Sequence, residues 1–301
     1  MTTQAETKRP LELPAMVALA LAGAAIGVGV VRLDGFGPKS FSDSGQFRLW
    51  LFLIAAQTAL FAIAAAYLVI LAHQKTLEGA WADGPGAVVA YVVAAAVPLY
   101  GFLVVVYEGT HTSKNPLPDR PWKLLGLYTL GTTIALIGVA VFALIRVCLQ
   151  NEGALGTAAD IARYVDLRRL LQRVLTIEGA ILAAAVLSAG ALRNAVLAFR
   201  HHQSAYPREY VFIVGAYYTL ILALLYAPVY AKLLQVGRAN LDAACPLVEP
   251  ASPEWLAAYE KREKLGQYLQ LEVTASSSFQ AGIAILAPLT SALIALLLGT
   301  R

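Results

Sequence analysis

Two charged residues in the fifth apolar block of the chain are the first candidates for chemistry. Glu178 and Arg193 flank an uncharged stretch of only 14 residues, Gly179 to Leu192. As a helix, that stretch measures about 21 Å, which is shorter than the roughly 30 Å hydrocarbon core of a bilayer. If this block crosses a membrane, at least one charge lies at hydrocarbon depth. An acid at that depth must be paired, protonated or next to water.

The two side chains differ in how they can escape the hydrocarbon. Arg193 can extend its long side chain toward the headgroups, whereas Glu178 is too short to do so. They lie too far apart on one helix to pair, and the candidate partners of Glu178 are Arg146, Lys232 and His73. We interpret Glu178, Arg193, Arg146 and Lys232 as an ion or proton pathway or a gate; the alternative is a structural ion pair near the membrane surface.

A second group of candidate residues lies toward the other end of the same blocks. Glu108 and His111 are three residues apart at the end of the third block, and His201 and His202 follow the fifth. Carboxylates and imidazoles together can bind zinc or iron, which makes this a hypothetical metal site. Four-helix di-iron sites use two Glu-x-x-His motifs and this chain has one, so the alternative is ordinary residues at headgroup depth. No nucleotide or other cofactor motif occurs, and we expect no cofactor.

Prolines and glycines mark places where the helices bend or approach closely. Pro98, Pro228 and Pro288 each remove a hydrogen bond within an apolar block, and such breaks act as hinges or as kinks that improve packing. Gly23 and Gly27 form a G-x-x-x-G pair, which permits close helix contact within or between subunits.

The composition indicates which solvent surrounds these residues. Of 301 residues, 58% are hydrophobic and 14% are charged, and the mean hydropathy is +0.64. A soluble domain carries about 25% charged residues, so this chain has too few for a water-exposed surface. The net charge of +4, without a long basic run, gives no sign of nucleic-acid binding.

The apolar residues fall into blocks about as long as a membrane-spanning helix. We predict an all-α, polytopic transmembrane bundle, with residues 1–301 as one domain. The expected spans lie near 13–31, 49–72, 84–107, 124–145, 174–199, 211–231 and 273–300. Residues 157–173, which follow a Thr157 cap, and residues 253–271 mix basic and apolar residues, so we expect two amphipathic cytoplasmic helices there.

The distribution of lysine and arginine predicts the orientation. With seven spans, the N-terminal side carries 13 of the 23 basic residues, which favours a cytoplasmic N-terminus. Cys148 and Cys245 then face the cytoplasm, where unpaired thiols are normal. We expect a multi-pass protein of the plasma (cytoplasmic) membrane.

These observations leave three classes of function open. Kinked spans, a buried acid and the lack of catalytic motifs favour a channel, pore or membrane-effector protein that acts as a homo-oligomer, which is not an enzyme. Protein partners are expected at the helices 157–173 and 253–271, and the lipid bilayer is the surrounding partner. The alternatives are a small secondary transporter, or a membrane enzyme that uses the glutamate and histidine residues at the non-cytoplasmic face.

Overall fold

The chain folds entirely into helices in the part that the computed structural model describes. That part comprises residues 12–33, 39–111, 122–151, 156–200, 208–247, 253–271 and 275–298. The helices, in chain order, are α1 (Leu13–Arg32), α2 (Lys39–Ser42), α3 (Gly45–Ala72), η1 (Lys75–Leu77), α4 (Glu78–Asp83), α5 (Pro85–His111), α6 (Trp122–Asn151), α7 (Ala158–Arg200), α8 (Arg208–Ala244), α9 (Trp255–Tyr268) and α10 (Ala275–Leu298). The expected all-α bundle is confirmed.

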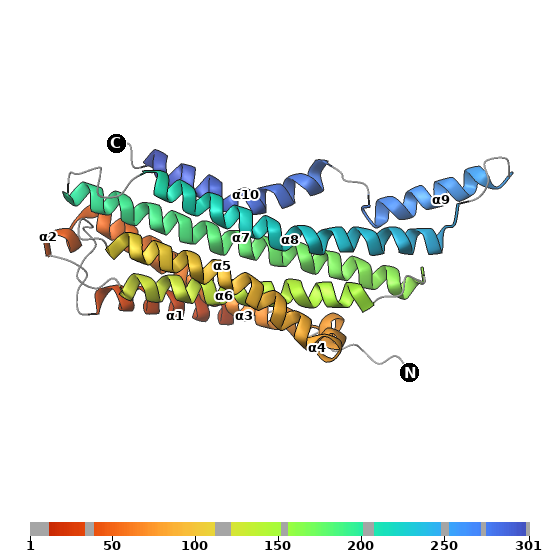
Figure 1. The fold of residues 1–301 in the computed structure, drawn as a ribbon, viewed down its shortest axis with the longest axis horizontal. Helices are drawn as coiled ribbons and strands as arrows, with labels where there is room; N and C mark the ends of the chain where they lie inside the picture. Colours follow the sequence, from red (N-terminus) through yellow and green to blue (C-terminus); the bar gives the residue numbers. More distant parts are fainter. Residues whose placement is uncertain are drawn as a thin grey trace.

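Within the described ranges, six helices are long and apolar enough to cross a membrane: α1, α3, α5, α6, α7 and α8. They lie along one common axis, and the chain reverses direction from one to the next (Figure 1). The block expected near 273–300 forms α10, whose apolar portion in the described part, Ala281–Leu297, is shorter. A seventh crossing through α10 stays a prediction.

Two of the expected boundaries differ from the structure. Residues 157–173 are not a separate interfacial helix but the start of α7, which begins at Ala158 and continues unbroken to Arg200. Thr157 does cap the start, since its hydroxyl accepts from the Asp160 backbone N–H at 3.2 Å. The helix continues because no proline interrupts residues 158–200, and leucine, alanine and arginine all favour helix. Likewise, α8 continues to Ala244, well past the expected end at residue 231.

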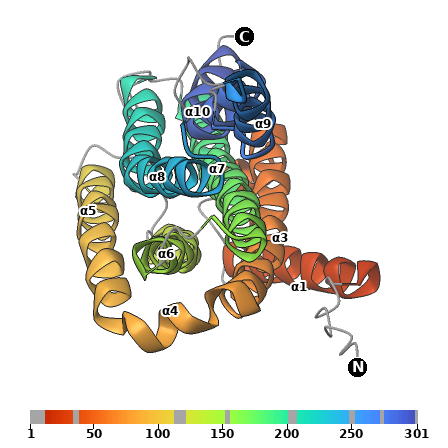
Figure 2. The same ribbon diagram turned by 90° about the vertical axis from the view of Figure 1, so that its right-hand side faces the viewer.

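α7 occupies the middle of the bundle and packs against α3, α6, α8 and α10 (Figure 2). At one end α6, α7 and α8 extend beyond α1 and α10, and α9 lies beside them (Figure 1). We call this the α9 end. At about 1.5 Å per residue the 43 residues of α7 measure about 64 Å, roughly twice a hydrocarbon core. Part of α7 must therefore stand outside a membrane that the bundle crosses.

Candidate functional site

Glu178 lies in the interior of the bundle, where a glycine of the neighbouring helix α6 leaves space for its side chain. Its side chain is 2% exposed and touches α6 at Gly138. A Cβ at Gly138 would overlap Oε1 of Glu178, so a larger residue there would require the carboxyl group to move. Oε1 has no hydrogen-bond partner among the described residues. The packing of α6 against α7 thus encloses an acid that it does not neutralise.

The residue after Glu178 also contacts a neighbouring helix closely. A Cβ on Gly179 would overlap the carbonyl oxygen of Ala284 in α10. Pro288, one turn further along α10, has no N–H to donate to that carbonyl. The kink in α10 therefore presents a carbonyl without its helical donor directly against the backbone next to Glu178. The carboxyl group of Glu178 and the carbonyl oxygen of Ala284, which lies against Gly179, are therefore close neighbours.

None of the expected partners forms an ion pair with Glu178 within the described ranges. Nδ1 of His73 lies 2.8 Å from the Val69 carbonyl in its own helix. Lys232 donates to Gln235 at 3.2 Å, and Arg146 is half-buried on α6. The structure therefore does not bring these residues together with Glu178.

Arg193 is 3% exposed and donates to Oδ1 of Asn194 at 3.4 Å. It follows Glu178 by 15 residues, or about 22 Å along α7. The two charged groups are therefore too far apart to compensate each other.

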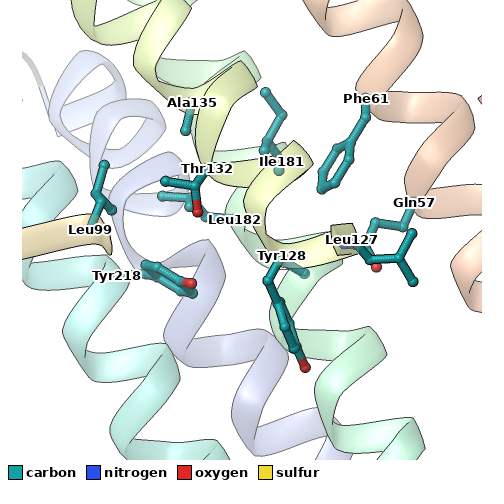
Figure 3. Close-up of a pocket in the computed structure, with 12 residues that line it drawn as sticks. Gln57, Phe61, Leu99, Leu127, Tyr128, Thr132, Ala135, Ile181, Leu182 and Tyr218 are labelled. Carbon is teal, nitrogen blue, oxygen red and sulfur yellow. The ribbon is translucent and has the colours of Figure 1, made fainter. Parts of the chain in front are cut away.

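A small cavity lies one helical turn from Glu178, toward the end opposite α9. Its volume is about 20 Å³, enough for one water molecule. Figure 3 shows Tyr128 and Tyr218 together on one side of it and Phe61 and Ala135 on the other. The lining residues are Gln57, Phe61, Leu99, Leu127, Tyr128, Gly131, Thr132, Ala135, Ile181, Leu182, Ala185 and Tyr218. Oε1 of Gln57, which is 4% exposed, has no hydrogen-bond partner in the part that is described.

A second cavity of about 10 Å³ adjoins the first. Tyr128, Ala185 and Tyr218 line both, and the second extends to Tyr210 and Ala189. The two cavities together follow one face of α7 for about two turns, from Ile181 to Ala189. Polar side chains therefore run through the core from the level of Glu178 toward the opposite end.

Tyrosine hydroxyls connect α5 to α8 near two of the prolines. Tyr217 donates to the carbonyl of Pro98 at 2.7 Å, and its ring stacks on Phe102 with centroids 4.1 Å apart. Tyr91 donates at 2.6 Å to the carbonyl of Leu225, which follows the carbonyl that Pro228 leaves without a helical donor. Both contacts satisfy backbone oxygens next to breaks in a helix and so fix the bends.

The G-x-x-x-G pair is used within the chain. Gly23 and Gly27 of α1 lie so close to Thr58 of α3 that a Cβ on either would overlap it. The hydroxyl of Thr58 donates to the Ile54 carbonyl at 2.8 Å, which removes a buried donor from this contact. The two glycines hold α1 against α3.

Two buried cations were not recognised from sequence. Arg168 is 5% exposed, and its Nη1 donates to the carbonyls of Leu269 at 2.7 Å and Gln270 at 2.6 Å, between α9 and α10. Lys123 is 1% exposed, and its Nζ donates to the carbonyls of Val31 and Leu33 at the end of α1. In both cases the acceptors are backbone oxygens at the end of a helix that is distant in the sequence. No local sequence pattern predicts such a contact.

The hypothetical metal site remains untested. His201 and His202 lie outside the described residues, as do the side chains of Glu108 and His111. Within the part of the chain that is described, no three histidine, cysteine or acidic side chains gather to hold a metal ion.

Comparisons with known proteins give no relative: no family model, no curated protein and no solved structure matches this chain. The class that the fold defines is a membrane protein built as a helical bundle.

Proposed function

We propose that this protein is a channel-type membrane protein that binds and passes protons, with Glu178 as the proton-binding group. The observation that carries the proposal is the enclosure of Glu178: 2% exposed, pressed against Gly138, with Oε1 unpaired among the described residues. A charged carboxylate in hydrocarbon costs several kcal/mol unless something compensates it. A group placed there for stability alone would be matched by a donor or a cation.

The size of the cavities favours the proton over other cargoes. About 20 Å³ and 10 Å³ admit single water molecules, whereas small organic ligands occupy about 300–1,000 Å³. A metal ion with its hydration shell does not fit either. A proton needs only hydroxyls and water, because each oxygen accepts one proton as it releases another. This conformation therefore supports the small-transporter alternative less well.

The route that we propose follows one face of α7. Glu178, Leu182, Ala185 and Ala189 are spaced four, three and four residues apart, so they share that face. Glu178 lies at one end, and the cavities next to Leu182, Ala185 and Ala189 lie further along. Their polar side chains are Gln57, Thr132, Tyr128, Tyr218 and Tyr210. A proton released by the Glu178 carboxyl passes to water in the larger cavity and then to the tyrosine hydroxyls.

The route lies within one chain, so it does not require several subunits. Homo-oligomerisation remains a separate proposal, to be tested by measuring the mass of the protein in detergent. The residues that extend beyond the bundle at the α9 end would serve the effector role, as a surface for protein partners.

Proton flux through liposomes tests the proposal. The full chain is reconstituted with a pH-sensitive dye inside, and a potassium gradient with valinomycin sets the voltage. We expect the wild type to acidify or alkalinise the lumen according to the sign of the voltage, and Glu178→Gln to abolish this flux. Tyr218→Phe should slow it, since the ring remains but the hydroxyl is lost.

Glu209→Gln is the matched control, because it makes the same change at an exposed position at the start of α8. It should conduct as the wild type does. Equal flux in Glu178→Gln and wild-type liposomes, with both proteins monodisperse, would contradict the proposal, as would wild-type flux no greater than that of empty liposomes.

A further inference from the structure

A groove between α3 and α7, nearer to the α9 end than Glu178, combines basic and polar side chains. Its volume is about 370 Å³, far larger than either interior cavity, and it opens to the surface. The lining residues are Tyr67, Arg169, Gln172, Arg173, Thr176 and Ile177. Two guanidinium groups, an amide, a hydroxyl and a phenol thus surround one space. These are donors that bind phosphate oxygens.

The position of the groove along α7 matches a lipid headgroup. Arg173 precedes Arg193 by 20 residues, which is about 30 Å of helix and one hydrocarbon thickness. With Arg193 at one boundary of the membrane, Arg173 lies at the other, on the side of the α9 end. Tyr67 contributes an aromatic ring at the same level, as is typical of membrane interfaces.

The same face of α7 turns apolar immediately beyond the groove. Ala180, Ala183, Ala184 and Leu187 continue the spacing of Arg173 and Thr176 and are all partly exposed. A headgroup in the groove would therefore leave its acyl chains along an apolar strip of the same helix. The acyl chains of a lipid would contact such a strip, whereas a free anion would bind in the groove alone.

Local carboxylates compensate the two arginines only in part. Asp166 lies 3.9 Å from Arg169, with both side chains mostly exposed (60% and 66%), and such a pair contributes little. Arg173 forms no ion pair with a carboxylate in the described part of the chain. The groove thus keeps a net positive charge.

We propose that this groove binds the headgroup phosphate of an anionic phospholipid in the leaflet at the α9 end. Basic pockets between membrane helices commonly bind such headgroups. The inference is independent of proton passage, because it concerns the lipid-facing side of α7, away from Glu178.

Native mass spectrometry of the delipidated full chain measures the binding. The probes are phosphatidylglycerol, phosphatidylcholine with the same acyl chains, and inorganic phosphate as competitor. Each arginine near an anionic lipid is worth about 1 kcal/mol, so Arg169→Gln with Arg173→Gln should weaken phosphatidylglycerol binding roughly thirtyfold. Phosphatidylcholine binding should not change, and inorganic phosphate should not compete.

Arg48→Gln is the matched control, an exposed arginine near the opposite end of α3, and should bind as the wild type does. If the double variant does not elute as a folded protein, Arg173→Gln alone should weaken binding about fivefold. Unchanged phosphatidylglycerol affinity in the folded variants would overturn the proposal. Displacement of the lipid by inorganic phosphate would overturn it too, because the groove would then be a site for a free anion.

Discussion

Arg168 and Glu178 lie ten residues apart on the same helix and are both almost fully buried, yet their surroundings are opposite. Nη1 of Arg168 donates to two backbone carbonyls, although its Nε has no acceptor among the described residues. Oε1 of Glu178 has no donor there at all and faces a glycine. The arginine fastens the connection between α9 and α10 to α7. Oε1 of Glu178 holds no other described element in place.

The comparison separates a buried charge that stabilises the fold from a buried acid for which we propose a function. A buried ionisable group that holds other elements in place contributes to the free energy of folding. A buried ionisable group without partners lowers stability and is retained for another reason, of which function is the most common. Substitutions at the two positions should therefore have opposite consequences for stability.

The largest effect is expected for Arg168→Met. Methionine keeps most of the apolar stem but leaves the carbonyls of Leu269 and Gln270 without a donor. The loss of the two charged hydrogen bonds should lower the free energy of unfolding by about 3 kcal/mol. SDS titration in mixed micelles measures this difference. Arg238→Met, at an exposed position on α8, should change it by less than about 0.5 kcal/mol. A neutral Arg168→Met would remove the basis of the comparison.

Gly138→Ala should follow, with a loss of about 2 kcal/mol, because the added Cβ overlaps the Glu178 carboxyl. The double variant Gly138→Ala, Glu178→Ala should recover most of that loss, since the clashing group is gone. The same titration gives the coupling free energy. Additive effects would mean that Gly138 and Glu178 do not share one space.

Lys123→Met extends the comparison to the other end of the bundle. Lys123 is a satisfied cation like Arg168, so its removal should destabilise the protein by about 1.5 kcal/mol through the orphaned carbonyls of Val31 and Leu33. Lys75→Met in η1, where the side chain is exposed, serves as control and should change the free energy of unfolding by less than about 0.5 kcal/mol. If Lys123→Met stabilised the protein, Lys123 would resemble Glu178, whose removal we do not expect to lower stability, rather than Arg168.

The smallest effect is expected for Glu178→Gln. The amide has nearly the same shape and cannot ionise, and no described residue pairs with Oε1 of the acid, so stability should rise or change by less than about 1 kcal/mol. Unfolding titrations of this variant and the wild type side by side give the difference. A loss as large as that of Arg168→Met would show that Glu178 has a structural partner and would break the distinction.

The apolar blocks predict the positions of the first three long helices within a few residues. The expected 13–31 corresponds to Leu13–Arg32, 49–72 to Gly45–Ala72, and 84–107 to Pro85–His111. These agree because hydrocarbon demands both apolar side chains and a self-satisfied backbone, and a sequence shows the first directly. The structure buries Glu178 inside the bundle, whereas its position at hydrocarbon depth stays a prediction.

What the sequence could not supply was how helices continue and meet outside the apolar blocks. Residues 157–173 look amphipathic in isolation, but their basic face includes Arg168, which is buried against carbonyls 101 and 102 residues away. No local pattern reports such a contact. The partners expected for Glu178 were chosen by charge and by membrane side, whereas the structure places a glycine there, because side-chain space and not charge decides which helices meet.

The unbroken length of α7 has a mechanical consequence. Its first residue, Ala158, precedes Glu178 by 20 positions, or about 30 Å of stiff rod. A tilt of α7 by about 5° about Glu178 would move Ala158 by about 2.6 Å, because residues 158–178 contain no proline or glycine at which the helix would kink. Arg168 ties the linker before α10 to the same rod, so the lever would carry this linker with it.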